Sequence, residues 1–223
     1  MLQLDWIPLP EPTWSAELMR SLNAWINSHE ILIRVIPITS DLFVFTYPLM
    51  LLALYLYGEY GPRATRLVYK MYSLLVLWSA ALIVVVNEII QIFVDKSRPE
   101  EFIENKEFLL LSHVPSPPFP SDHAGVSAAV AMSMTIWAWH GNNIVLKTLA
   151  VYLWLACLIM SFSRVWLAIH WPMDVVAGIV LGASVPLVIR YTRLWSWWKT
   201  YCAMPLIQLQ NWIWQKFSLH KRL

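Results

Sequence analysis

The chain has 223 residues, of which 58% are hydrophobic and 13% are charged, and its mean hydropathy is +0.54. This composition is too apolar for a soluble domain of this length and is typical of an integral membrane protein. The net charge of +2, without a basic run interleaved with aromatic residues, argues against a nucleic-acid partner. Cys157 and Cys202 lie far apart in the sequence, so they predict neither a disulfide framework nor a metal site.

The first forty residues predict an amphipathic helix that lies in the membrane interface. Trp14, Leu18, Leu22 and Trp25 recur at spacings of four, four and three, which places them together on one helical face. The segment carries acidic residues where a cleaved leader has a basic region, so we expect the membrane helices to direct targeting. The simplest role for this helix is to anchor the protein at the membrane surface.

Five apolar stretches are long enough to cross a hydrocarbon core of about 30 Å. They cover residues 41–57, 67–94, 122–140, 144–163 and 173–192. The tail that follows them is rich in tryptophan, which suits the headgroup layer. We therefore predict an all-α, polytopic transmembrane bundle of five to six membrane helices within a single domain, residues 1–223, with interfacial flanks at 1–40 and 193–223.

The distribution of charge predicts how this bundle is oriented. With five crossings, the segments on one side hold ten basic residues and a single acid, Glu59. The segments on the other side hold more acids than bases. Because basic loops remain in the cytoplasm, the second set is expected to face outward. The outward segments are 1–40, 95–121 and 163–173.

Polar residues gather at the helix ends on this outward face. They occur in KSRP at 96–99, PSDH at 120–123 and SRVWLAIHWPMD at 163–174. Pro99 ends the second span at Arg98, and the helix that starts after Ser121 offers unpaired N–H groups and a positive dipole to a phosphate. Arg164 adds a planar fork of donors. Two arginines and a helix start therefore predict a pocket for a phosphate dianion.

Two histidines in these stretches can transfer a phosphoryl group without a metal or other cofactor. Asp174 lies about one turn inside the fifth span, so its carboxylate can reach back to His170, fix its tautomer and stabilise its cation. His123 stands at the start of the third span. One histidine can attack phosphorus while the other protonates the departing oxygen.

Simpler explanations stay open for single residues of this set. Arg98 alone could be a snorkelling anchor, and Asp122 could be only a helix cap. Asp122 and Ser163 are candidates to support the site, and His113, in the loop beside it, could touch a headgroup. The remaining histidines have no such neighbours and are expected at the interface: His29, His140 and His220.

Together the three stretches resemble the type-2 phosphatidic acid phosphatase superfamily, whose relatives include the vanadium haloperoxidases. The family signature is K-x6-R-P, then P-S-G-H, then S-R-x5-H-x3-D, and its third part matches in full from Ser163 to Asp174. The resemblance covers about residues 85–182. It implies that His170 is the nucleophile and forms a phosphohistidine, that Asp174 orients it, and that His123 is the general acid. The phosphate-binding residues that it implies are Arg98, Arg164 and Ser121.

The chain departs from this signature at two positions. Gln91 stands seven positions before Arg98, where the family has lysine, while Lys96 is only two positions away. We expect the Gln91 amide to bind phosphate and Glu88 to orient it, with Lys96 as the alternative ligand. The second departure is Asp122, which stands where the family motif P-S-G-H has glycine. The stretch FPSDH resembles the undecaprenyl-diphosphate phosphatase branch of bacteria, as does LNAWINSHEIL before the first span.

These features predict a multi-pass enzyme of the bacterial inner membrane that hydrolyses undecaprenyl diphosphate to undecaprenyl phosphate on the outer face. Its partners are then a lipid phosphate substrate and membrane lipid, and the sequence does not indicate an oligomeric state. Phosphatidylglycerophosphate, phosphatidic acid or lipid A remain alternative substrates, and transfer between lipids is an alternative reaction. A non-enzymatic lipid binder or scramblase fits less well, because the third part of the signature is complete. The membrane spans argue against a haloperoxidase.

Overall fold

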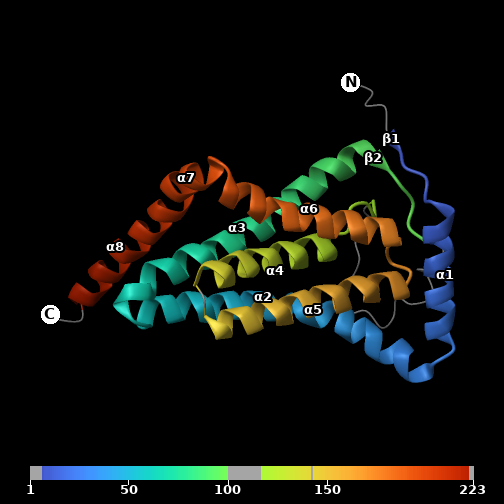
Figure 1. Ribbon diagram of the computed structural model, residues 1–223, viewed down its shortest axis with the longest axis horizontal. Helices are drawn as coiled ribbons and strands as arrows, with labels where there is room; N and C mark the ends of the chain where they lie inside the picture. Colours follow the sequence, from blue (N-terminus) through green and yellow to red (C-terminus); the bar gives the residue numbers. More distant parts are fainter. Residues whose placement is uncertain (1–6, 100–116, 142, 221–223) are drawn as a thin grey trace.

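The structure is a computed structural model and describes residues 7–99, 117–141 and 143–220, so His113 lies outside the described residues. This part of the chain is almost entirely helical, which confirms the predicted all-α class (Figure 1). The helices are α1 (Thr13–Asn27), α2 (Glu30–Tyr60), α3 (Arg63–Phe93), α4 (Asp122–Gly141), α5 (Ile144–Trp166), α6 (Pro172–Tyr191), α7 (Leu194–Trp198) and α8 (Met204–His220), with a π-helical turn at Lys199–Ala203 before α8. Two short strands, β1 (Ile7–Pro8) and β2 (Val94–Asp95), pair in parallel.

Four of the described helices are long and apolar enough to cross a membrane: α2, α3, α5 and α6. The predicted third span forms the helix α4, but with its many alanine, serine and glycine residues it has no 18-residue stretch as apolar as those of the four helices. In the bundle α4 contacts α3, α5 and α6, and most of its side chains are buried (Figure 1). Because its neighbours surround it, α4 needs less hydrophobicity than a helix that faces lipid.

The helix α2 begins at Glu30, whereas the sequence predicted a span from residue 41. The earlier start is favoured by the apolar residues that follow Glu30 and by an exposed ion pair of 2.8 Å between Arg34 and Glu30, one helical turn apart. Pro37 and Pro48 lie inside the helix, where each removes one backbone hydrogen bond. The predicted interfacial flank therefore ends with α1 rather than at residue 40.

The helix α1 lies across one end of the bundle of long helices (Figure 1). It packs on α2, α5 and α6 through Met19 and Ile26, which are buried, while the Asn23 amide donates a 2.9 Å hydrogen bond to the Trp166 carbonyl. The predicted apolar stripe, which includes Trp14 and Leu18, faces away from the protein and is exposed. This two-faced arrangement suits a helix that lies at the membrane surface.

Glycines bring α4 and α6 into backbone contact. A Cβ atom at Gly182 would lie 2.1 Å from the Gly125 carbonyl oxygen, and one at Gly178 would lie 2.5 Å from the Ser121 carbonyl oxygen. Small residues at such crossings let helix backbones approach closely in membrane proteins. The contact holds the first turns of α4 and α6 next to each other.

Candidate active site

The turn after α5 places His170. The Ile169 N–H donates to the Arg164 carbonyl at 3.0 Å and the Ala168 N–H donates to the Val165 carbonyl at 3.0 Å, which is the pattern of a Schellman motif. Ala168 takes the left-handed conformation that this motif requires, with φ of 51°. The His170 N–H also reaches the Arg164 carbonyl, at 3.2 Å. The backbone of this turn thus ties the position of His170 to that of Arg164.

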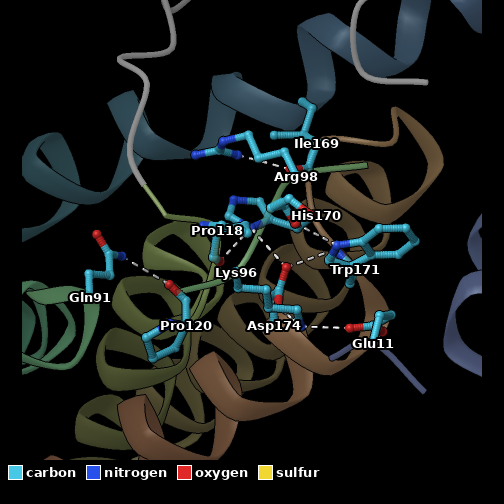
Figure 2. Close-up of polar contacts among 11 residues, drawn as sticks. Glu11, Gln91, Lys96, Arg98, Pro118, Pro120, Ile169, His170, Trp171 and Asp174 are labelled. Carbon is cyan, nitrogen blue, oxygen red and sulfur yellow. Dashed lines mark hydrogen bonds and ion pairs between the residues drawn. The ribbon is translucent and has the colours of Figure 1, made fainter. Parts of the chain in front are cut away.

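The imidazole of His170 is oriented by a backbone carbonyl. Its Nδ1 atom lies 2.9 Å from the Pro118 carbonyl oxygen and 3.7 Å from Asp174 Oδ2 (Figure 2). A carbonyl can only accept a hydrogen bond, so Nδ1 carries the proton and the Nε2 lone pair is left free. The sequence predicted that Asp174 fixes this tautomer; in the structure the hydrogen bond goes to Pro118, and Asp174 contributes a nearby negative charge.

Asp174 lies in the first turn of α6, which begins at Pro172 as the sequence predicted. The carboxylate is fully buried, and its Oδ2 atom accepts a 2.9 Å hydrogen bond from the Trp171 backbone N–H. Its Oδ1 atom lies 2.5 Å from Lys96 Nζ. Asp174 is thus a fixed charge beside the imidazole, held from both sides.

Lys96 joins two carboxylates. Its ammonium group lies 2.5 Å from Asp174 Oδ1 and 2.6 Å from Glu11 Oε2, and the three side chains are 3%, 0% and 10% exposed, respectively (Figure 2). The pairing of β1 with β2 brings the segment before α1 alongside Lys96, since the Leu9 N–H donates to the Asp95 carbonyl at 3.1 Å. The sequence offered Lys96 as a phosphate ligand and did not indicate Glu11, because their contact depends on strand pairing between distant segments.

Two arginines flank the imidazole from different elements. The Arg98 guanidinium donates a 2.9 Å hydrogen bond to the Ile169 carbonyl, and the Trp171 indole N–H donates to the Ser97 carbonyl at 2.9 Å. These bonds fasten the chain after α3 to the turn between α5 and α6. Arg164, at the end of α5, is fully buried. The structure thus brings both predicted arginines to the turn that carries His170.

Burial lowers the pKa of His170 below its ordinary value near 6.5. The Asp174 carboxylate opposes this shift, while the positive charges of Arg98 and Arg164 lower the pKa further. The imidazole is therefore neutral at neutral pH, and it lies in a positive electrostatic field. A neutral nitrogen beside fixed positive charge is suited to attack an anionic phosphorus centre.

The start of α4 provides the third part of the site. The Ser121 N–H donates to the Asp174 carbonyl at 3.0 Å, which joins α4 directly to α6. The Ser121 hydroxyl is buried and has no hydrogen-bond partner among the residues that the structure describes. The Asp122 carboxylate accepts a 2.8 Å hydrogen bond from the Asn87 amide, so α3 also supports this helix start. A buried hydroxyl without a partner is a group that can bind an incoming oxygen anion.

His123 lies where the polar site meets the apolar interior. It is half-buried at the beginning of α4 and lines a cavity of about 120 Å³. The other residues around this cavity come from α2, α4 and α5: Val44, Tyr47, Asp122, Val126 and Met160. Their side chains make the cavity mainly apolar, which suits a hydrocarbon group next to the imidazole.

Other predicted residues have different partners. The Gln91 amide is buried and donates to the Pro120 carbonyl at 3.3 Å, while Glu88 lies on an exposed face of α3 and makes no hydrogen bond or ion pair with a described residue (Figure 2). Asn87 and Gln91, one turn apart, share the buried face, which explains why Glu88 points elsewhere. The Ser163 hydroxyl bonds within its own helix, to the Met160 carbonyl at 2.6 Å. Within the described ranges no three His, Cys, Asp or Glu side chains form a group that could hold a metal ion.

Comparison with known proteins finds related sequences. Over 117 residues, the chain is 32% identical to YbjG of Escherichia coli (strain K12), which is provisionally named as an undecaprenyl-diphosphatase. The match covers 47% of this chain and 54% of YbjG. The chain thus spans about half the length of that relative. It is 24% identical to the undecaprenyl-diphosphatase BcrC of Bacillus subtilis (strain 168) over 169 residues, which cover 76% of this chain and 79% of BcrC.

The fold is similar to that of a solved crystal structure. The crystal structure of LpxE from Aquifex aeolicus matches with a TM-score of 0.54 and 17% sequence identity, over 82% of this chain and 98% of LpxE. The sequence model of the PAP2 superfamily matches residues 72–198, a region that contains His123, His170 and Asp174. Since this match covers more than half of the sequence, the chain belongs to the PAP2 superfamily.

Proposed function

We propose that this protein hydrolyses the terminal phosphate of an isoprenoid diphosphate, converting undecaprenyl diphosphate to undecaprenyl phosphate and inorganic phosphate. The observation that carries the proposal is the geometry of His170, whose Nδ1 atom is held by the Pro118 carbonyl at 2.9 Å while Nε2 stays free. The similarity to BcrC, which is named as an undecaprenyl-diphosphatase, supports the choice of lipid.

In this proposal the terminal phosphate lies between the turn after α5 and the start of α4. Arg98 and Arg164 balance its negative charge, and Ser121 donates its buried hydroxyl to a phosphate oxygen. The unpaired N–H groups at the start of α4 and the positive end of the helix dipole also favour an anion. Gln91 acts through the Pro120 carbonyl and positions this helix start, since its amide bonds to the backbone at 3.3 Å.

The reaction takes two steps. First the Nε2 lone pair of His170 forms a bond to the terminal phosphorus, and the bond from that phosphorus to the bridging oxygen breaks. The bridging oxygen keeps the electron pair and takes a proton from the His123 imidazolium, so undecaprenyl phosphate leaves. In the second step His123 takes a proton from water as the water oxygen bonds to phosphorus and the P–N bond breaks. Between the two steps, Asp174 stabilises the positive charge on the phosphorylated His170 ring.

The apolar cavity beside His123 supplies a place for the lipid side of the substrate. Its volume of about 120 Å³ is small, so it accommodates the first part of an isoprenoid chain rather than the whole tail. The remaining tail would lie among membrane lipids along α2 and α5, whose outer faces carry many exposed apolar side chains. His123 then stands next to the bridging oxygen that it protonates.

We place this reaction on the outer face of the bacterial inner membrane. The basic residues near the α2–α3 turn and in the tail lie toward the end of the bundle away from His170, which fits the preference of basic segments for the cytoplasm (Figure 1). In the same proposal residues 1–223 act as one domain, because Glu11 before α1 reaches the site and Gln210 of α8 accepts a hydrogen bond from Lys70 of α3.

A panel of purified lipid phosphates tests this function. The full chain in detergent, with a chelator present, is given undecaprenyl diphosphate, phosphatidic acid or phosphatidylglycerophosphate, and released phosphate is measured. We expect the diphosphate to be the preferred substrate, activity to survive the chelator, and His170→Ala to lose turnover by many powers of ten. Preference for a monophosphate would overturn the substrate assignment, and near-normal turnover by His170→Ala would overturn the mechanism.

A further inference from the structure

A second cavity, of about 430 Å³, is lined by the start of α3 and by α8. These segments lie at the end of the bundle opposite to the turn between α5 and α6 (Figure 1). The polar and apolar walls of the cavity include Arg63, Arg66, Leu67, Lys70, Asn211 and Trp214. The phosphatase chemistry uses none of these residues. The cavity therefore calls for an explanation of its own.

The base of this cavity is electrically balanced. The Lys70 side chain is 2% exposed and forms an ion pair with Glu59 from the end of α2. Gln210 of α8 joins both groups, since its Oε1 accepts from Lys70 Nζ at 3.1 Å and its Nε2 donates to Glu59 Oε2 at 3.1 Å. The Tyr55 hydroxyl donates to the same Oε1 atom at 2.5 Å. This network neutralises the charge of Lys70 and connects α2, α3 and α8.

The other two cationic side chains of the cavity, Arg63 and Arg66, are not neutralised in this way. Neither Arg63 nor Arg66 forms an ion pair with a described residue. The Nε atom of Arg66 is buried and has no hydrogen-bond partner among the described residues. A buried donor without an acceptor destabilises a protein, and both arginines stand in the first turn of α3, where the helix dipole is also positive. Charge and hydrogen bonding therefore both favour an anion.

The walls of the cavity identify the kind of anion. Leu67 and Trp214 are 46% and 49% exposed, and both border the cavity next to the arginines. Arginine offers a planar fork of donors that matches phosphate oxygens, while leucine and tryptophan favour the hydrocarbon part of the same molecule. Tryptophan is also enriched at the depth of lipid headgroups. A free phosphate ion would contact the arginines and leave the apolar wall of Leu67 and Trp214 without a partner.

We propose that this cavity binds the phosphate group of an anionic phospholipid of the membrane leaflet opposite to His170. Arg63 and Arg66 hold the phosphate, the Asn211 amide adds a hydrogen bond, and the glycerol and first methylene groups lie against Leu67 and Trp214. The lipid joins the start of α3 to α8 and supplies the acceptor that Arg66 Nε lacks. Bound in this way, it stabilises the packing of α8 on the bundle.

The test measures the stability of the full chain in a neutral detergent with three additives: phosphatidylglycerol, phosphatidylcholine or inorganic phosphate. We expect phosphatidylglycerol to raise the thermal unfolding midpoint in a saturable way and to remain bound in native mass spectra. Arg66→Gln should weaken this response, with half-saturation at about tenfold more lipid, as expected for the loss of one charged phosphate contact. Lys199→Gln is the matched control, because Lys199 is an exposed cation outside the cavity.

An unchanged response to phosphatidylglycerol in Arg66→Gln would overturn the site, and an equal response to phosphatidylcholine would overturn its preference for an anion. If inorganic phosphate matches phosphatidylglycerol, the site takes free anions and the lipid assignment is wrong. Should Arg66→Gln fail to fold, Arg63→Gln serves in its place, since Arg63 is exposed. No turnover is measured, so the result is independent of the proposed enzymatic function.

Discussion

The pKa of His170 makes the mechanism testable at a single residue. Burial and two guanidinium groups lower this pKa below about 6.5. Because attack requires the neutral imidazole, the acid limb of the activity should lie below that ordinary value. Arg98→Gln removes one of the positive charges that lower the pKa. We therefore expect the acid limb of kcat/KM in Arg98→Gln to move to higher pH than in the parent, with overall activity reduced.

The measurement is a pH profile of kcat/KM for both proteins with the same lipid substrate, so that ionisation of the substrate cancels in the comparison. A limb that stays in place, or moves to lower pH, would show that Arg98 does not act on the nucleophile.

Glu11 offers a second test at this scale. It holds one side of the Lys96 ammonium, 2.6 Å away, while Asp174 holds the other. Glu11→Gln removes the outer charge, so that Asp174 alone balances the Lys96 ammonium. We expect the Asp174 carboxylate then to stabilise the His170 cation less. The expected result is a fall in kcat of about tenfold, near 1.4 kcal/mol, with little change in KM. Kinetics of the purified variant provide the check.

Glu17→Gln is the matched control, because Glu17 is an exposed acid of α1. Equal kinetics in the two variants would leave Glu11 with a purely structural role. A thermal unfolding midpoint measured alongside separates loss of rate from loss of folded protein.

Residue types and spacing were sufficient to predict the groups that are close in sequence. His170, Asp174 and Arg164 lie within one turn and the two helix ends beside it, so local geometry brings them together. The Pro118 carbonyl and Glu11 could not be predicted in this way. One is a backbone atom in a loop and the other comes from a segment 85 positions before Lys96, so only the tertiary packing brings them to the site.

The contact between α4 and α6 leads to a prediction at the scale of elements. At Gly182 a Cβ atom would lie 2.1 Å from the Gly125 carbonyl oxygen, so Gly182→Ala forces the two backbones apart. We expect it to lower the free energy of unfolding by about 1–3 kcal/mol or more. It should also reduce activity, since Ser121 and Asp174 are positioned by the same pair of helices. The checks are a thermal unfolding midpoint and phosphate release.

Gly141→Ala is the control for this substitution. There a Cβ atom would meet Leu146 Cδ1 at an ordinary 3.6 Å, so stability should be nearly unchanged. Similar stability of the two variants would contradict the tight crossing.

The first residues of α4 and α6 were easier to predict from the sequence than whether a helix faces lipid or is buried by its neighbours. Pro172 marked the start of α6 and the predicted start at residue 122 matches α4, because proline and capping residues act locally. The start of α2 was missed, because the apolar residues after Glu30 continue the helix even though Pro37 lies inside it and proline disfavours a helix interior. The burial of α4 was missed too, because hydropathy does not distinguish a lipid-facing helix from one that its neighbours surround.

At the scale of the whole molecule, orientation in the membrane is the property to test. Ser28 directly follows α1 and Thr65 lies in the first turn of α3, and both are exposed. α1 and the start of α3 lie at opposite ends of the bundle (Figure 1). In a background without Cys157 and Cys202, we expect Ser28→Cys to react with a membrane-impermeant thiol reagent added outside intact spheroplasts. Thr65→Cys should react only after the membrane is opened. The opposite labelling pattern would place the reaction in the cytoplasm.

The modest hydrophobicity of α4 has a consequence for biosynthesis. A segment of alanine, serine and glycine partitions weakly from the translocon into lipid when it is alone. α5, which follows after a short connection with Asn143 as its N-cap, is strongly apolar and packs against α4. We therefore expect α4 to depend on α5 to enter the bilayer, with the two inserting as a helical hairpin. The start of α4, with Ser121 and His123, reaches its final place only after most of α5 has been synthesised.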